Sequence, residues 1–136
     1  MDFMRSIFIA ATGLRAQSGR MRVIAENIAN ANSTSQTPNA DPYRRRVPTF
    51  STSFDRELQA TVVKMGNVRT DQSDFTVRNE PSHPAADAAG NVKYPNVNTL
   101  IETVDMREAQ RSYEANLNVI SATRRMIART IEILKT

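Results

Sequence analysis

One short segment holds the residue types of a nucleophilic catalytic site. His83 lies between Ser82 and Pro84, and Asp87 follows closely. A hydroxyl, an imidazole and a carboxylate are the groups of a nucleophile, its base and the residue that orients the base. However, His83 is the only histidine, and no glycine-rich phosphate loop, HExxH motif or nucleophile elbow is present. We therefore expect no enzyme activity, no catalytic residue and no cofactor, and expect this segment to shape a loop.

An arginine cluster suggests a different chemistry. Arg44, Arg45 and Arg46 follow Tyr43, and such a group can contact phosphates and stack on a base. The net charge of +4 permits binding to nucleic acid, an acidic polymer or a membrane surface without choosing among them. Elsewhere the positive charges are interspersed with acidic residues, as is usual on a solvated or subunit-facing surface. We expect no nucleic-acid partner, but a small basic nucleic-acid-binding protein that uses this cluster remains the alternative.

The composition excludes other kinds of site and bounds the size of the fold. Because the chain has no cysteine and one histidine, it has no disulfide or thiolate metal site, and we expect no metal. A chain of 136 residues with 40% hydrophobic residues fits one domain with a modest core. No run approaches the roughly 20 apolar residues of a membrane span. Charged residues also interrupt the N-terminal apolar run, so we expect no membrane insertion and no cleaved signal peptide.

The prolines divide the chain into three parts. All six lie between Pro38 and Pro95, so both ends are free to form long helices. Apolar residues at helical spacing predict an N-terminal helix over 3–32 and a C-terminal helix over 98–135. The insert, residues 33–97, is first polar and turn-rich and then β-rich, with strands predicted within 58–68 and 75–77. The predicted fold is a mainly α single domain whose terminal helices pack as an antiparallel coiled-coil-like pair.

The C-terminal helix carries apolar residues on two nearly opposite faces. One face includes Met106, Tyr113, Ile120 and Ile127. A helix that is apolar on both sides must be covered on both sides, and this chain offers only one other long helix and a polar insert. The alternative is an ordinary core helix that is buried on both faces within one subunit. We predict instead that the second strip packs against other subunits. That strip comprises Ile101, Val104, Ala115, Val119, Ala122, Met126 and Ile133.

Asparagines cluster at the end of the N-terminal helix. Asn27 and Asn30 fall on one helix face, although asparagine is a poor helix former. An asparagine in the left-handed conformation can cap a helix C-terminus, which would explain Asn30 or Asn32 but not Asn27. A polar amide within a packed seam can fix register at some cost in stability. We expect Asn27 and Asn30 to lie on a close-packed face between subunits and Asn32 to end the helix.

Two glycines lie inside the N-terminal helix. Gly13 and Gly19 each cost about 1 kcal/mol relative to alanine at a mid-helix position. The isolated helix should therefore be marginal, and it should become ordered when a partner covers its apolar seam. The glycines also allow neighbouring groups to approach the helix closely.

The run from residue 11 to residue 34 resembles the N-terminal signature of the flagellar rod and hook axial proteins. In that family this signature lies on a helix that takes part in assembly. The resemblance marks Leu14, Asn27, Ile28 and Asn30 as subunit-interface residues. The matching positions are held by Ala11, Gly13, Leu14, Ala16, Arg20, Ile24, Ala25, Asn27, Ile28, Ala29, Asn30 and Thr34.

A second block, residues 80–134, resembles the proximal rod proteins of the same family. Two residues, Glu80 and Asn91, depart from the usual pattern, and 36–41 resembles an insertion. The family's other short rod protein is the nearest alternative, and the stretch 83–98 argues against it. The loop motif is matched by Pro81, His83, Pro84, Ala86, Asp87, Tyr94, Pro95, Asn96, Val97 and Asn98.

The resemblance implies a structural subunit of the bacterial flagellar basal body. Such a subunit would polymerise through its terminal helices into the periplasmic proximal rod, which transmits motor torque. Its implied partners are further copies of itself, the other short rod protein, the distal rod proteins and the rod-base adaptor. It would reach the periplasm through the flagellar type III export apparatus without a cleaved signal peptide.

Overall fold

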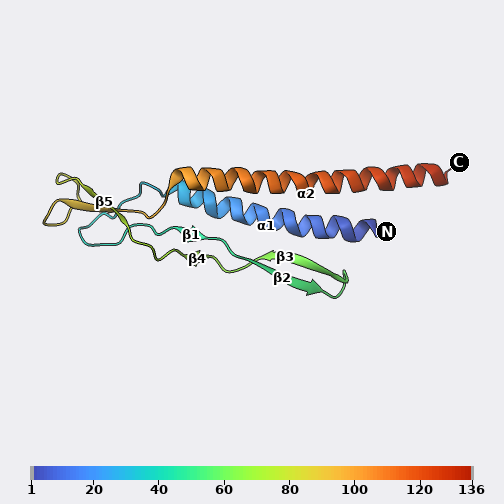
Figure 1. Cartoon of the computed structure of the whole chain (residues 1–136), viewed down its shortest axis with the longest axis horizontal. Helices are drawn as coiled ribbons and strands as arrows, with labels where there is room; N and C mark the ends of the chain where they lie inside the picture. The colour runs from blue at the N-terminus through green and yellow to red at the C-terminus, as the bar shows by residue number, and fades with distance from the viewer. Residues whose placement is uncertain (1, 136) are drawn as a thin grey trace. The chain divides into compact units, whose positions relative to one another are not determined.

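The computed structural model of the chain describes residues 2–135 and contains two long helices with strands between them (Figure 1). Helix α1 covers Phe3–Ala29 and helix α2 covers Thr99–Leu134. The strands are β1 (Arg46–Val47), β2 (Phe50–Asp55), β3 (Ala60–Met65), β4 (Arg69–Thr70), β5 (Thr76–Asn79) and β6 (Asn91–Tyr94). The predicted mainly α class, with two terminal helices and a strand-containing insert, is confirmed.

The strands pair as three separate two-stranded antiparallel sheets, β1 with β4, β2 with β3 and β5 with β6. The predicted range 58–68 contains β3, and the predicted range 75–77 overlaps β5. The prediction missed β1, β2, β4 and β6. Of these, β2 pairs with β3 along its whole length, from Phe50 opposite Met65 to Asp55 opposite Ala60. The turn between them is fixed locally, because Asp55 Oδ1 accepts the N–H groups of Glu57 and Leu58.

Side-chain caps fix where both helices begin. Asp2 Oδ1 accepts the N–H of Arg5 at 3.1 Å. Asn98 Oδ1 accepts the N–H groups of Leu100 and Ile101 at 3.0 and 3.4 Å. Each cap satisfies donors that have no partner within the first helical turn. Among residues 2–135, no helix has the length and apolar character needed to cross a membrane.

The chain divides into two compact units, and each contains parts of both helices and of the insert. Unit 1 comprises Met1–Met21, Pro48–Asn67 and Arg107–Thr136. Unit 2 comprises Arg22–Val47 and Val68–Met106. The predicted segments 3–32, 33–97 and 98–135 follow the order of the chain, whereas the units follow contacts between distant parts of it.

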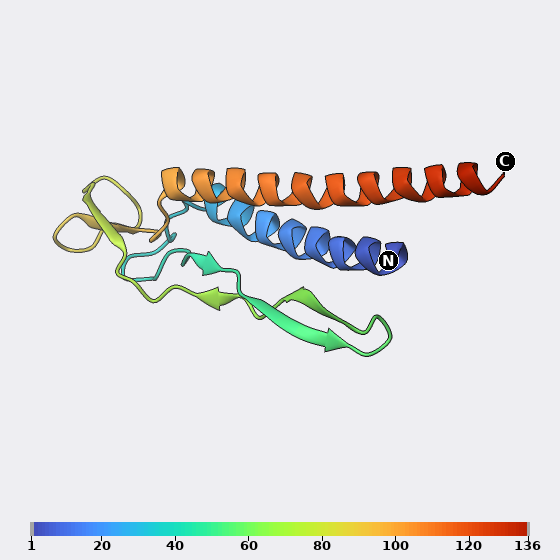
Figure 2. The ribbon, with the colours of Figure 1, turned by 45° about the vertical axis from the view of Figure 1, so that its right-hand side comes forward.

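Within unit 1, α1 and α2 run antiparallel (Figure 2). Arg20 of α1 forms an ion pair with Glu108 of α2 at 3.5 Å. Closer to the N-terminus, Gly13 lies against Asn116, so that a Cβ at Gly13 would be only 2.9 Å from Asn116 Oδ1. Residues of α1 that lie closer to its N-terminus therefore face residues of α2 that lie closer to its C-terminus, as in any antiparallel pair. Glycine permits this close approach, since a larger residue would displace the amide.

The β2–β3 hairpin packs against α1 in the same unit. Ala16 on α1 and Val62 on β3 are both buried. At Gly19, an added Cβ would collide with the sulfur of Met65. The methionine side chain therefore occupies space that any other residue at position 19 would fill. The close approach expected at Gly13 and Gly19 occurs, and in both cases the approaching side chain belongs to this chain.

We predict that the effect of Gly19→Ala on the free energy of unfolding depends on the side chain of Met65. In the parent chain the added methyl group must displace the thioether, which offsets the gain of about 1 kcal/mol in helix propensity. In a Met65→Ala background the same substitution should be more favourable, by a coupling free energy of about 1–2 kcal/mol. Urea unfolding followed by circular dichroism on the four chains of this cycle measures the coupling. Equal effects in both backgrounds would contradict the packing described here.

Candidate functional site

The side-chain amide of Asn27 is the centre of a buried polar network in unit 2. This side chain is 0% exposed. Its Nδ2 donates to the carbonyl oxygen of Arg46 at 2.8 Å and to Glu102 Oε2 at 3.0 Å. Its Oδ1 accepts the N–H of Arg46 at 2.9 Å and the hydroxyl of Tyr43 at 2.8 Å. All four hydrogen bonds of the amide are formed, and Asn27 pairs with Arg46 as a neighbouring β-strand would.

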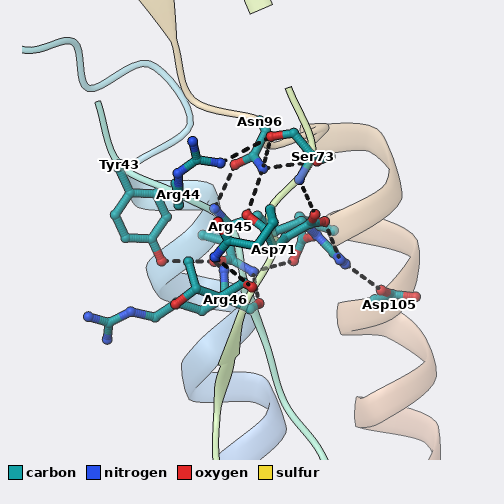
Figure 3. A network of polar contacts seen from close by, with 12 residues as sticks. Tyr43, Arg44, Arg45, Arg46, Asp71, Ser73, Asn96 and Asp105 are labelled. Carbon is teal, nitrogen blue, oxygen red and sulfur yellow. Dashed lines mark hydrogen bonds and ion pairs between the residues drawn. The ribbon is translucent and has the colours of Figure 1, made fainter. Parts of the chain in front are cut away.

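Glu102 supplies a buried negative charge in the first turn of α2. Its side chain is 1% exposed, and its Oε1 accepts the Nε–H of Arg45. The N-terminal end of a helix favours a negative charge. Arg45 also lies 3.7 Å from Asp71 and 3.8 Å from Asp105 (Figure 3). Burial alone would lower the pKa of Arg45, but the hydrogen bond and the charge of Glu102, with those of the two aspartates, raise it.

Asp71 holds the turn that follows β4. Its Oδ1 accepts the N–H of Ser73 at 2.9 Å. This backbone hydrogen bond is the main reason that the pKa of Asp71 lies below its ordinary value, and the Ser73 hydroxyl and Arg45 act in the same direction. Because its pKa is lowered, the carboxylate of Asp71 is ionised at every pH above the ordinary pKa of an aspartate, and its charge contributes to the network.

Asn96 connects the segment before α2 to the same network. Its Oδ1 accepts the N–H of Arg45 at 2.8 Å. Its Nδ2 donates to the carbonyl oxygens of Asp71 and Ser73, both at 3.2 Å, and to Ser73 Oγ at 3.0 Å (Figure 3). Asn96 belongs to the predicted loop motif. Its side chain connects the backbone of Arg45 to the turn that contains Asp71 and Ser73.

The arginine cluster is occupied by groups of its own chain. Arg44 lies 4.0 Å from the centre of the Phe75 ring and donates to the carbonyl oxygen of Ser73. Arg45 faces three carboxylates, as described above. Arg46 forms an ion pair with Glu26 at 3.2 Å. These contacts explain the arginines without a phosphate ligand, so the geometry favours a structural role over the nucleic-acid alternative.

The predicted loop residue His83 binds backbone and hydroxyl groups. Its Nδ1 accepts the N–H of Ala85 at 3.1 Å, and its Nε2 lies 3.3 Å from Thr34 Oγ1. Because Nδ1 is an acceptor, the proton of the neutral ring lies on Nε2. The nearby Asp87 Oδ1 accepts the N–H groups of Ala89 and Asn91, both at 2.9 Å. The imidazole and the carboxylate thus hold loop backbone and do not form a catalytic pair.

Two further loop-motif residues, Tyr94 and Pro95, also contribute to unit 2. Tyr94 donates its hydroxyl to the carboxylate of Glu80, at 3.1 Å from Oε1 and 3.0 Å from Oε2. Pro95 is buried, whereas Pro84 is exposed. Within residues 2–135, no group of three or more histidine or acidic side chains is arranged to hold a metal ion. The loop-motif residues His83, Asp87, Tyr94 and Asn96 thus make contacts that hold the fold of unit 2.

Six of the seven residues of the predicted outward strip of α2 are exposed, and Ala122 is half-buried. The exposed fraction ranges from 45% at Met126 to 73% at Ile133, and Ile101, Val104 and Val119 lie between these values. A large part of each of these side chains is therefore accessible in the single chain. On α1, by contrast, Leu14 and Ile28 are half-buried in the chain itself.

The asparagines differ from the sequence-based expectation. Asn27 is buried inside its own chain, where we expected a face between subunits. Asn30 likewise donates its amide to the carbonyl oxygen of Glu26 at 2.8 Å and so caps the last turn of α1 with its side chain. The expected left-handed cap is absent, since Asn39 and Gln59 are the only non-glycine residues with a positive φ in the described range 2–135.

The chain is similar to proteins of a known family. Residues 7–35 match the family described as flagella basal body rod protein, and residues 88–133 match flagellar basal body rod FlgEFG protein C-terminal. The flagellar basal-body rod protein FlgC of Agrobacterium fabrum is 53% identical over 93% of this chain and 91% of the relative. FlgC of Borreliella burgdorferi is 36% identical over 99% of both chains, and FlgC of Bacillus subtilis is 34% identical over 99% and 100%.

We predict that Asn27→Leu destabilises the chain by about 3–5 kcal/mol. The substitution leaves the peptide groups of Arg46 without their partner and removes a donor from a buried carboxylate. Urea unfolding measures the loss, and amide hydrogen exchange at Arg46 should become faster. The matched control is Asn32→Leu at an exposed position, which should change stability by less than about 0.5 kcal/mol. Unchanged protection at Arg46 would contradict the pairing.

We predict a pH-dependent effect of Asp71→Asn. Because the pKa of Asp71 is lowered in the folded chain, its ionised form stabilises the fold above the ordinary pKa, and this stability is lost as the pH falls through the lowered value. The variant should be less stable by about 1 kcal/mol at neutral pH, since the site is partly exposed. The difference should shrink as the pH falls below the ordinary pKa of an aspartate, and it should disappear once the pH lies below the lowered pKa of Asp71. Urea unfolding across this range tests it, with the exposed Asp74→Asn as control.

Proposed function

Since the chain belongs to the FlgC family of flagellar basal-body rod proteins and is a structural rod subunit, we propose that it builds the proximal rod and polymerises through its terminal helices to transmit motor torque. The family and its structural role come from the relatives. The proximal position, the polymerisation surface and the transmission of torque are the proposal. The close FlgC relatives favour this assignment over the other short rod protein, FlgB.

The observation that carries the proposal is the exposed apolar strip of α2. In unit 1 the side of this helix that faces α1 is buried at Ala109 and Thr123, whereas Val119 and Met126 are 47% and 45% exposed. Contiguous apolar surface of this kind marks an interaction site in a soluble protein. A strip that does not pair with itself builds an open helical assembly when each subunit contacts the next in the same way.

The rest of the proposal concerns partners and location. We infer that the chain contacts further copies of itself, FlgB, distal rod proteins and the rod-base adaptor in the periplasm. It would be delivered by the flagellar type III export apparatus without a cleaved signal peptide. The internal pairing of Arg44, Arg45 and Arg46 supports this reading over nucleic-acid binding, because those charges already have partners.

We predict that Val119→Asp combined with Met126→Asp prevents rod assembly without preventing export. Each carboxylate would have to be buried without a partner at the subunit contact. Both positions are exposed in the single chain, so the fold itself should be unaffected. Swimming assays and isolation of basal bodies measure assembly, and detection of the chain outside the cytoplasm measures export.

The control for this experiment is Gln110→Asp combined with Asn118→Asp. Both positions are exposed on the same helix and already polar. This variant should assemble rods and support swimming. Motile cells with intact rods from the Val119 and Met126 variant would show that the strip is not the subunit contact.

A further inference from the structure

The sulfur of Met65 lies against α1 at Gly19, within unit 1. A Cβ added to Gly19 would collide with this sulfur, but it would lie 3.7 Å from Cγ and 3.8 Å from Cε of the same side chain. Because the two carbons are farther away by nearly equal amounts, the bend of the thioether points at the helix. The two lone pairs of a thioether sulfur lie on the outer side of this bend. Both lone pairs of Met65 are therefore directed toward Gly19.

These lone pairs are the groups that a peroxide oxidises. The sulfur donates an electron pair to one oxygen of hydrogen peroxide, so that an S–O bond forms and the O–O bond breaks. The departing hydroxide takes the proton of the transferred oxygen and leaves as water. The sulfur is oxidised by two electrons, and the peroxide is reduced. The product is methionine sulfoxide, which is polar and which a methionine sulfoxide reductase returns to the thioether.

The contact with Gly19 leaves no room for this added oxygen. On either lone pair, the oxygen would occupy the space between the sulfur and the helix backbone. The thioether must therefore leave Gly19 before it is oxidised, and the sulfoxide cannot return to the same position. A place outside the contact is available, because Met65 is half-buried and lines a hollow of about 280 Å³ between α1 and β3. A hollow of this volume admits a peroxide molecule, which is little larger than water.

The β2–β3 hairpin has few other apolar contacts to hold it on α1. Its two strands form a sheet of their own, and an isolated two-stranded hairpin is marginally stable in water. In these strands, which the structure describes in full, Val62 is the only buried residue. Phe50 and Phe54 are 43% and 60% exposed. Loss of the contact between Met65 and Gly19 should therefore loosen the hairpin.

We propose that Met65 is a site of reversible oxidation by peroxides, and that its sulfoxide keeps the β2–β3 hairpin from packing on α1 at Gly19. The packed thioether is the protected form, and oxidation retains the side chain in the position that it takes when it leaves the helix. This modification site is separate from the proposed rod assembly, and its test does not depend on that function.

The first test measures the rate at which hydrogen peroxide oxidises each methionine of the full purified chain, by mass spectrometry of its peptides. Met65 should be oxidised at least about fivefold more slowly than Met126, which is 45% exposed. In concentrated urea the two rates should become equal, because the contact with Gly19 is lost.

Gly19→Ala should increase the oxidation rate of Met65 severalfold, because the added methyl group displaces the sulfur from the helix. The matched control is Gly13→Ala, whose added Cβ meets Asn116 and not Met65, so the rate at Met65 should be unchanged. Met21 is half-buried on the same helix. Its oxidation rate should stay constant in both variants if each remains folded.

The second test measures amide hydrogen exchange over residues 60–65 before and after peroxide treatment. Exchange should become faster once Met65 is oxidised, and methionine sulfoxide reductase should restore the slower exchange. Met65→Leu, treated with the same peroxide, should keep its slow exchange, because leucine is not oxidised. Met126→Leu should respond to peroxide as the parent chain does.

Three results would overturn the inference. These are equal oxidation rates of Met65 and Met126 in the folded parent chain, unchanged exchange over 60–65 after Met65 is oxidised, and faster exchange in the peroxide-treated Met65→Leu chain. The first two use the parent chain alone, so they decide the question even if Gly19→Ala does not fold.

Discussion

The buried carboxylate of Glu102 is the constraint on which the arrangement of unit 2 depends. A buried charge is costly unless a partner charge and hydrogen bonds accompany it. Arg45 supplies the charge and Asn27 supplies a second donor. Because Asn27 also binds both peptide groups of Arg46, the requirement of one carboxylate on α2 fixes a residue on α1 and the path of the chain between the two helices.

Polar and small residues, more than large apolar ones, determine how the helices of this chain meet. The buried apolar set consists mainly of alanines and valines, and Gly13 lies against the amide of Asn116. Small side chains allow close approach, and polar contacts select one register. This choice leaves about half of the large apolar side chains of residues 2–135, such as Val119 and Met126, exposed. A weakly filled interior and an apolar exterior are two aspects of one fold that is suited to assembly.

The sequence predicts the elements whose signals are periodic and local. Both helices follow from spacing, and β3 follows from β-branched residues. Strand β2 was missed because three of its six residues, in the sequence FSTSFD, are serine or aspartate, which have low strand propensity; β2 forms because β3 is available to pair with it. The network was missed because Asn27 and Glu102 are 75 residues apart. The one available signal was that Asn27 lies too early to cap its helix, and we assigned that signal to another subunit.

The buried Asn27 and the exposed apolar residues of α2 have different roles, although the sequence analysis assigned both to contacts between subunits. A buried amide must be satisfied in the folded subunit, whatever that subunit later binds, because water cannot reach it. Asn27 meets this condition with groups of its own chain, so its role is completed before any contact between subunits. The exposed apolar side chains of α2 are in the opposite situation, since a large part of each remains accessible in the described chain. Asn27 therefore stabilises the subunit, whereas the exposed side chains of α2 are those that we propose for its assembly.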